Sequence, residues 1–363
     1  MLHRLTNHPI WTRLHDWTHL HHTAVYAIAG LGIVLAASLI AFGILYQPPQ
    51  KGEIISSSNT KKQPPPPAYF SPLTGKPIAN EAATKQPVTA IMMENSPDSR
   101  PQSGLKDSGV VFEAIAEGGI TRFLALYQQE KPGIIGPVRS VRLYYVQWAN
   151  PFNASIAHVG GSLFALREVR NGKYRDIDQF YNGGTYWRAT DRYAPHNVYT
   201  SFAKLDALNA SKGYNTSEFT GFNRKDLAAS KTPNATSINV GISGPAYNSS
   251  YTYDAATNTY PRSQGGAPHL DREQGQIAPV SVVVMNVNMT RTFEDGYREQ
   301  ITTLGNGPVT IFQDGVAITG KWHKQYLESQ LSFTTDDGKD IPLNRGQTWI
   351  TAIPNGQGSV AWK

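Results

Sequence analysis

The sequence predicts a protein of the α+β or α/β class with a single transmembrane helix at its amino end. A mixed α/β domain follows, and then a mostly antiparallel β part. Three observations predict this: an uncharged run at 24–46, alternating strand-like and helix-like runs up to residue 239, and almost only strand-like runs after it. The predicted divisions are a tail (1–23), a helix (24–46), a stalk (47–68), an α/β domain (69–239) and a β-rich domain (240–363).

The composition narrows the possible functions. Of 363 residues, 40% are hydrophobic and 17% are charged, which is typical of a globular protein. The net charge of +6 is too dilute over this length for a nucleic-acid-binding protein, so we expect no nucleic-acid partner. The sequence has no cysteine, which excludes disulfides, thiolate metal sites, cysteine nucleophiles and a lipidated cysteine within it. No metal site is predicted, and no cofactor can be identified.

Residues Ala24–Tyr46 form the predicted membrane helix. At about 1.5 Å per residue, 23 uncharged residues span a hydrocarbon core of roughly 30 Å. The alternative is a cleaved signal peptide, whose apolar core has about 7–15 residues and ends in a small-x-small site. This run is longer, and Gln47-Pro48-Pro49 follows it without such a site. We therefore expect an uncleaved, single-pass anchor in the cell membrane.

The basic residues beside this helix do not decide its orientation, because both flanks carry them. A short tail before the helix and a large folded part after it favour an amino end in the cytoplasm and an extracytoplasmic body. The tail holds six of the ten histidines, and a polar membrane-proximal tail is favoured over a metal-binding tract. The stalk is rich in Pro, Ser and Lys, which favours an extended spacer.

The α/β domain is predicted from short apolar runs and periodic segments. Strands are expected at Pro87–Met93, Gly109–Ala116, Thr121–Gln128 and Ser155–Val159, and helices at Ser140–Ala149, Ser162–Arg170 and after Thr200 or Ser201, ending at Gly213. In the β-rich part, Asp314-Gly315 and Asp336-Asp337-Gly338 lie between strand-like runs and predict hairpins.

Candidate site residues lie directly after the predicted strands, next to glycines, where ligand sites of α/β sheets form. The predicted ligand-binding residues are Glu94, Arg100, Arg122, Arg139, Ser140, Arg142, His158, Ser162 and His196. Arginine presents a planar set of donors that suits carboxylate or phosphate, so an anionic or glycan ligand is expected. The alternative is that these charges pair with one another and hold loops together.

Three functions remain open at this level. The leading hypothesis is an envelope protein that binds an anionic or cell-wall glycan ligand without turning it over. The second is an envelope hydrolase or transferase, with Glu113, Glu117 and His158 as catalytic candidates meeting Arg139 and Arg142 in one open pocket. The third is a non-catalytic scaffold, for which no protein partner can be identified. His269-x-Asp271, near Arg262, is only a weak metal signal.

Several segments resemble the YerB-like family of bacterial envelope lipoproteins. They are ENSPDSRPQSGL (94–105), VVFEAIAEGGITRFLALY (110–127), IGPVRSVRLYYV (135–146), HVGGS (158–162), APHNVYTS (194–201), VSVVVMNVN (280–288) and LNRGQTWITAIP (343–354). The resemblance implies a bacterial source, an extracytoplasmic location and a domain of unknown function with a carboxyl-terminal companion, but no activity. This sequence lacks the family's lipid-bearing cysteine, and the helix at 24–46 would replace that anchor.

Overall fold

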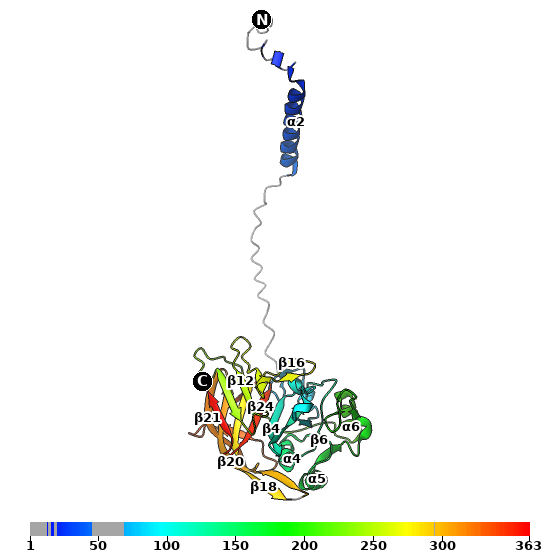
Figure 1. Ribbon diagram of the computed structural model, residues 1–363, viewed down its shortest axis with the longest axis vertical. Coiled ribbons are helices and arrows are strands. Elements are labelled where there is room, and N and C mark those ends of the chain that lie inside the picture. The colour runs from blue at the N-terminus through cyan, green and yellow to red at the C-terminus, as the bar shows by residue number, and fades with distance from the viewer. Residues whose placement is uncertain (1–12, 14–15, 18–19, 46–68, 294) are drawn as a thin grey trace. The chain divides into compact units, whose positions relative to one another are not determined.

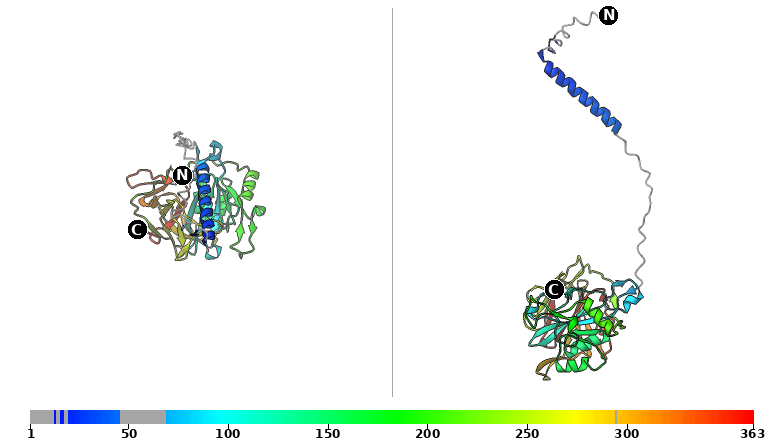
Figure 2. Two further views of the ribbon diagram at one scale, coloured as in Figure 1. Left: turned by 90° about the horizontal axis from the view of Figure 1, so that it is seen from above. Right: turned by 90° about the vertical axis from the view of Figure 1, so that its right-hand side faces the viewer.

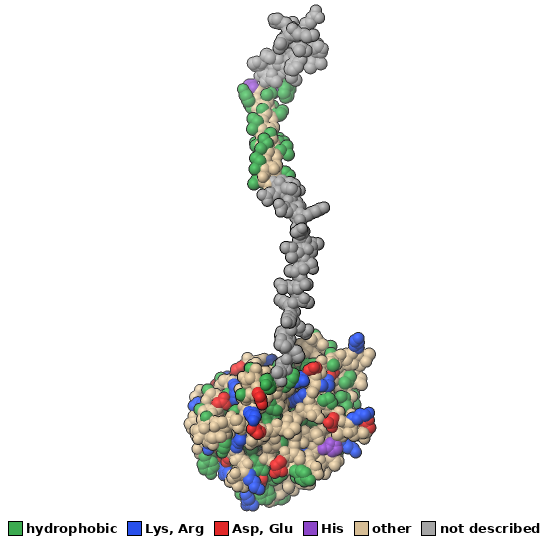
Figure 3. Space-filling view, turned by 180° about the vertical axis from the view of Figure 1, so that it is seen from behind, with side chains coloured by type: hydrophobic (Ala, Val, Ile, Leu, Met, Phe, Trp, Pro, Cys, Tyr) green, Lys and Arg blue, Asp and Glu red, His purple; other side chains and the backbone are tan. Residues whose placement is uncertain are grey.

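The computed structural model describes residues 13, 16–17, 20–45, 69–293 and 295–363, in two units, Met1–Pro65 and Pro66–Lys363. Most of the predicted tail and the whole predicted stalk lie outside the described residues. In the first unit, α2 (His22–Leu45) has a mean hydropathy of 2.5 and is, among the described residues, the one helix long and apolar enough to cross a membrane. It contains no Lys, Arg, Asp or Glu, and hydrophobic side chains cover it (Figure 3). A helix therefore occupies the predicted segment, and its ends lie within two residues of the predicted ones; its insertion in a membrane stays a prediction.

The second unit, called the body here, is built around a ten-stranded mixed sheet (Figure 1). In spatial order its strands are β22 (Ser332–Thr334), β21 (Val316–Lys324), β20 (Gly305–Gln313), β17 (Ser281–Val287), β24 (Thr348–Pro354), β4 (Val110–Glu117), β5 (Ile120–Tyr127), β3 (Thr89–Glu94), β6 (Ser155–His158) and β7 (Arg175–Asp178). The central strands are buried along nearly their whole length, which explains their continuous apolar runs.

Strand β24 lies between two strands that are distant from each other in the sequence. It lies between β17 and β4 and runs parallel to both, so that Thr348 is paired with Ser281 on one side and Val110 on the other. Figure 1 shows β4 and β24 next to each other in the middle of the body. The predicted boundary between residues 239 and 240 thus falls within one compact unit whose sheet contains strands from both sides.

Layers cover both faces of this sheet. Helices α4 (Leu143–Ala149) and α5 (Leu163–Val169) pack on one face, and their apolar side chains share a core with alternate residues of β3, β4 and β17. Helix α6 (Phe202–Ser211) and a second sheet pack on the other face. The strands of the second sheet, in spatial order, are β14 (Ala267–Pro268), β13 (Arg262–Gln264), β12 (Ser249–Thr252), β11 (Ser237–Gly241) and β25 (Ser359–Trp362). The right-hand view of Figure 2 shows the green helices in front of the strands.

The remaining elements are short. They include the pairs β1 (Tyr69–Phe70) with β2 (Pro77–Ile78), β8 (Trp187–Arg188) with β9 (Val198–Tyr199), β10 (Arg224–Lys225) with β23 (Leu343–Asn344), β15 (Leu270–Asp271) with β16 (Gly275–Gln276) and β18 (Met289–Phe293) with β19 (Tyr297–Ile301), and the one-turn helix α3 (Glu81–Thr84). Of these, the β18–β19 hairpin matters most for the site described below.

Local sequence signals account for several element ends. Ser201 caps α6, because its side chain accepts a hydrogen bond from the Lys204 amide, as predicted. Asp314 and Gly315 have φ angles of 58° and 79° and form the predicted tight turn between β20 and β21. Helix α4 is shorter than the predicted Ser140–Ala149, because Val141 pairs with Gly161 in an extended conformation before the helix begins.

Candidate functional site

The chain between β5 and α4 places the predicted arginines at one end of β3. The Arg139 amide donates to Met92 O at 2.8 Å, and the Glu94 amide donates to Pro137 O at 3.0 Å. On its other side this segment contacts the glycines that follow β6, through a 3.0 Å hydrogen bond from the Val141 amide to Gly160 O. The segment is therefore fixed between β3 and β6, and its arginines lie beside Glu94 and the ends of β4 and β5.

Glu117 is the carboxylate on which most of these arginines converge. Arg142 Nε donates to Glu117 Oε1, Arg122 Nη2 lies 3.2 Å from Glu117 Oε2, and Arg298 Nε lies 3.9 Å from Glu117 Oε1. Burial alone would raise the pKa of Glu117, but the hydrogen bond from Arg142 and the charges of the arginines outweigh it and lower this pKa. Glu117 is therefore an anion held within a ring of guanidinium groups.

Arg122 is one of the two nearly buried arginines of this group. Its side chain is 8% exposed, and its Nη1 donates to Ser140 O at 3.1 Å. Burial, followed by repulsion from Arg142, lowers its pKa to about 10. Its Nε is buried and has no hydrogen-bond partner. Two nearly buried guanidinium groups thus share one carboxylate, which is an electrostatically costly arrangement.

Glu94 is the second carboxylate of the site and is 4% exposed. Arg139 Nε lies 3.3 Å from Glu94 Oε1, and His196 Nδ1 lies 2.9 Å from Glu94 Oε2. Ser96 Oγ donates to Glu94 Oε1 at 3.2 Å. Glu94 and Arg122 are cross-strand partners on β3 and β5. Glu94 and its partners therefore lie next to the group around Glu117. We call Arg122, Arg139, Arg142 and Arg298 the arginine cluster.

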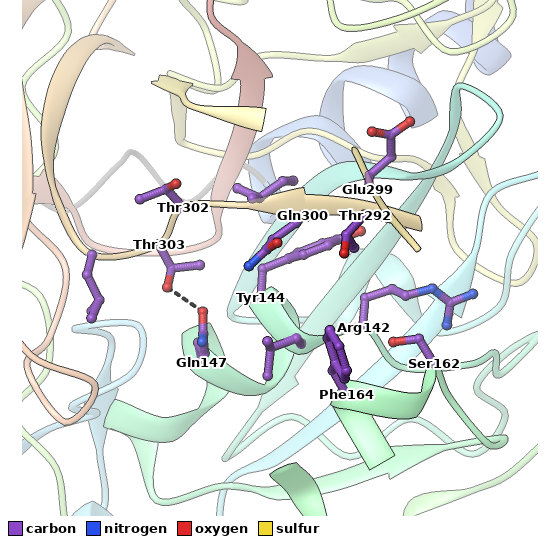
Figure 4. A pocket seen from close by; sticks show the side chains of 13 residues that line it. Arg142, Tyr144, Gln147, Ser162, Phe164, Thr292, Glu299, Gln300, Thr302 and Thr303 are labelled. Carbon is purple, nitrogen blue, oxygen red and sulfur yellow. Dashed lines mark hydrogen bonds between the residues drawn. The ribbon is translucent and has the colours of Figure 1, made fainter. Parts of the chain in front are cut away.

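A cavity of about 230 Å³ opens beside Arg142. Figure 4 shows Arg142 and Ser162 next to each other at one side of it, with the β18–β19 hairpin along the opposite side. Ser162 is 1% exposed and precedes α5. The lining mixes polar and apolar side chains: the polar ones include Glu299 of β19 and Thr303, whose hydroxyl donates to Gln147 at 2.6 Å. The cavity therefore offers hydrogen-bonding groups next to positive charge.

The three catalytic candidates do not meet. Glu113 has no exposed surface, and its Oε2 accepts hydrogen bonds from Arg262 at 2.8 Å and from Trp349 at 2.9 Å. His158 is also fully buried, with Nε2 2.9 Å from Asp176 Oδ1 and Nδ1 2.8 Å from Gly160 O. Of the three candidates, only Glu117 contacts the arginine cluster. The geometry that the acid–base hypothesis requires is absent from the described residues.

A β-bulge separates Glu113 from Glu117. The register between β4 and β5 shifts between Ile115 and Glu117, so the alternation of side chains along β4 is interrupted there. Glu113 is enclosed beneath the second sheet, where Arg262 belongs to β13. Glu117 instead meets arginines that precede α4 and lie on β5 and β19.

The other predicted residues have structural partners. Arg100 donates from Nε to Asn95 Oδ1 at 3.0 Å and from Nη2 to Asn95 O at 2.8 Å, and burial lowers its pKa. His269 Nδ1 contacts Arg262 Nη1, and burial lowers the pKa of His269 well below its usual value. Asp271 accepts hydrogen bonds from backbone amides, including that of Lys106 at 3.0 Å. Within the described ranges no group of three metal-ligating side chains occurs, so His269 and Asp271 do not form a metal centre there.

Sequence reasoning missed Arg298. This residue lies on β19, in a hairpin that is remote in sequence from the arginine-rich loop, and its Nε also lies 3.0 Å from Asp295 Oδ1. The only local signal for it is a short segment, Tyr297–Ile301, with two adjacent charged residues. Such a segment predicts a partly solvated strand and does not indicate which residue Arg298 meets.

Comparison with known proteins identifies the family. The amino-terminal domain model described as "Protein of unknown function (DUF3048)" matches residues 73–215, and the corresponding carboxyl-terminal domain model matches residues 238–350. The chain belongs to the DUF3048 family. A relative, "Putative lipoprotein YerB" of Bacillus subtilis (strain 168), is 32% identical over 290 residues, which is 78% of this chain and 86% of YerB.

A solved structure agrees with this assignment. The crystal structure of the YerB protein from Bacillus subtilis matches with a TM-score of 0.71 and 30% sequence identity, and the match covers 81% of this chain and 99% of that chain. The predicted resemblance to the YerB-like family and the mixed α/β fold are thereby confirmed. The DUF3048 family has no activity in its description, so the function has to be argued from the site.

Proposed function

We propose that this DUF3048 protein binds an anionic ligand through its arginine cluster. The observation that carries this proposal is the sharing of Glu117 by Arg122 and Arg142, whose side chains are only 8% and 7% exposed. Folding alone does not require two guanidinium groups to lie together in a poorly solvated place, since their repulsion destabilises the body. A phosphate or carboxylate group in the adjoining cavity would offset that repulsion and would accept further hydrogen bonds.

A ligand that binds only the folded state raises the melting temperature, and the test uses this. The full chain in detergent is titrated with inorganic pyrophosphate while tryptophan fluorescence reports unfolding. At 100 times the dissociation constant, the stabilisation is about 2.7 kcal/mol. Arg142→Gln should abolish the shift. Lys85→Gln, which removes an equal charge from an exposed pair with Glu218, should retain it. Equal shifts in both variants, or none in the unaltered chain, would contradict the proposal.

We propose further that α2 anchors the protein in the cell membrane once, with the amino end in the cytoplasm and the body outside. Two observations support this: the length and hydropathy of α2, and the similarity to a protein named as a lipoprotein. Since this sequence has no cysteine, the helix would take the place of a lipid anchor. Protease added to cells stripped of their wall should degrade the body while a tag before residue 22 stays protected. A protected body would contradict this orientation.

A further inference from the structure

Two neighbouring aromatic side chains, Phe180 and Tyr181, follow the edge strand β7, and each is 71% exposed. We call this pair the aromatic ledge. Large aromatic side chains are usually mostly buried, and two adjacent ones on the surface often mark a binding site. The question is which ligand the ledge would contact.

The ledge is held in place from beneath. Gly160 has a φ angle of +60°, and a Cβ built on it would lie 3.1 Å from Cε2 of Phe180, so the ring rests against bare backbone. The Tyr181 ring lies 4.9 Å from the guanidinium carbon of Arg170. Asp178 joins these parts, because it accepts hydrogen bonds from the amides of Gly160 and Phe180 and from Arg170 Nη2 at 2.6 Å. The rings are therefore positioned while much of their surface stays open to solvent.

The same glycine links the ledge to the arginine cluster. Gly160 O accepts a hydrogen bond from the Val141 amide at 3.0 Å, and the Val159 amide donates to Arg139 O at 3.1 Å. Val141 lies in the sequence between Arg139 and Arg142. The backbone beneath Phe180 is thus paired directly with the segment that carries two of the cluster's four arginines.

We propose that the ligand of this site is a glycan chain whose sugars carry phosphate or carboxylate groups, with a sugar ring stacked on the aromatic ledge. The inference rests on the proposed anion binding by the arginine cluster and names the ligand class. A sugar has an apolar C–H face that packs on an aromatic ring, while its hydroxyls stay in water. Its anionic groups would meet the arginines nearby.

The test is co-sedimentation of the full chain, in detergent, with bacterial cell walls. One portion of wall is intact, and the other is treated with hydrofluoric acid, which removes phosphodiester-linked polymers. Phe180→Ala and Tyr181→Ala should each weaken binding to intact wall by about fivefold. Tyr326→Ala removes a ring of similar exposure, 61%, from a different loop and should bind as the unaltered chain does. Pyrophosphate should stabilise all three variants equally, because the arginines are untouched.

The outcomes separate the two proposals. Equal wall binding by all variants, with the pyrophosphate shift intact, would overturn the proposed sugar stacking on the aromatic ledge. It would leave the proposed anion binding in place. No pyrophosphate shift in any form would overturn anion binding. Retained binding after acid treatment would assign the anionic groups to carboxylates of the remaining wall, and its loss would assign them to phosphate. Binding of the unaltered chain to vesicles of anionic lipid that depends on Phe180 would overturn the glycan assignment in favour of a membrane.

Discussion

Glu113 and Arg262 form an ion pair inside the body, with 2.8 Å between Glu113 Oε2 and Arg262 Nη2 and no exposed surface on either side chain. The pair connects β4 of the large sheet with β13 of the second sheet. The Arg262 guanidinium also lies 4.4 Å from the centre of the Trp349 ring on β24. Three strands that are remote in sequence, β4, β13 and β24, therefore meet at this buried ion pair.

Removing one member of this pair should strongly destabilise the body. Arg262→Met leaves the Glu113 carboxylate buried without its cation, and we expect the free energy of unfolding to fall by about 3–5 kcal/mol. Urea unfolding of the full chain in detergent measures this. The matched change Lys76→Met breaks an exposed pair with Glu130 and should cost less than about 1 kcal/mol. A loss of similar size in both variants would show that burial adds nothing to the pair.

If the arginine cluster binds an anion as proposed, Glu117 competes with that anion for the same guanidinium groups. Glu117→Gln removes this internal anion, so pyrophosphate should bind several-fold more tightly to the variant. Asp295→Asn makes the same change of charge and also affects Arg298, but it does not touch Arg122 or Arg142, and it should alter the affinity less. Isothermal titration of each variant gives the affinities. Weaker binding by Glu117→Gln would mean that the carboxylate positions the arginines for the ligand.

The same competition predicts a pH dependence of binding. The arginines lower the pKa of Glu117 although burial opposes this, so the carboxylate stays ionised until the pH falls below its usual range. Protonation then frees the arginines, and pyrophosphate binding should strengthen as the pH falls through this pKa, provided that the body stays folded. In Glu117→Gln that increase should be absent. The comparison of the two pH profiles is the measurement.

Asp314 should make the body sensitive to acid. Burial would raise its pKa, but hydrogen bonds from Lys225, Asn258, Asn344 and the Ala228 amide together lower it. Its contribution to stability is therefore complete above the usual carboxyl pKa and is lost as the pH falls through the lower, folded-state value. Asp314→Asn keeps a residue that tolerates the positive φ of 58° and should lose about 2 kcal/mol at pH 7.

The check on Asp314 is the difference in unfolding free energy between the unaltered chain and Asp314→Asn, measured from pH 7 to pH 3. The difference should shrink as the pH falls below about 4. A difference that stays constant over this range would show that charge at residue 314 does not matter.

The proposed anchor predicts how α2 responds to charge. An arginine at the centre of a membrane helix costs about 2.5–3.5 kcal/mol on insertion scales. Leu35→Arg combined with Val34→Arg should shift the chain from the membrane fraction to the soluble fraction of lysed cells. Ser38→Leu should leave it in the membrane. Retention of the double-arginine variant after an alkaline wash would argue against α2 as the anchor.

Local patterns predicted much of the fold. The apolar runs at Pro87–Met93, Gly109–Ala116 and Thr121–Gln128 became β3, β4 and β5, because four- to eight-residue apolar runs suit strands buried on both faces. The insertion of β24 beside β4 was not predictable in this way. That pairing joins Thr348 to Val110, and no local signal reports such a distant neighbour.

Part of the site was predictable from sequence, because several of its residues come from neighbouring segments. Arg122, Arg139 and Arg142 come from segments that lie close in sequence, and the structure brings them together near Glu94 and Glu117. Glu113 looked equivalent to Glu117, but the bulge after Ile115 and the burial by the second sheet separate their environments. His158 looked like a site residue because glycines follow it, yet its ring is enclosed by Asp176 and Gly160.

The position of β24 also constrains how the body is made. During synthesis, β4 emerges more than 200 residues before β24, the strand that pairs with one of its edges. Until β24 arrives, one edge of β4 and one edge of β17 lack their final partner, and such open edges recruit other strands. The body therefore completes its central sheet only after residues 348–354 have been released, and a truncation after residue 345 would leave an aggregation-prone chain.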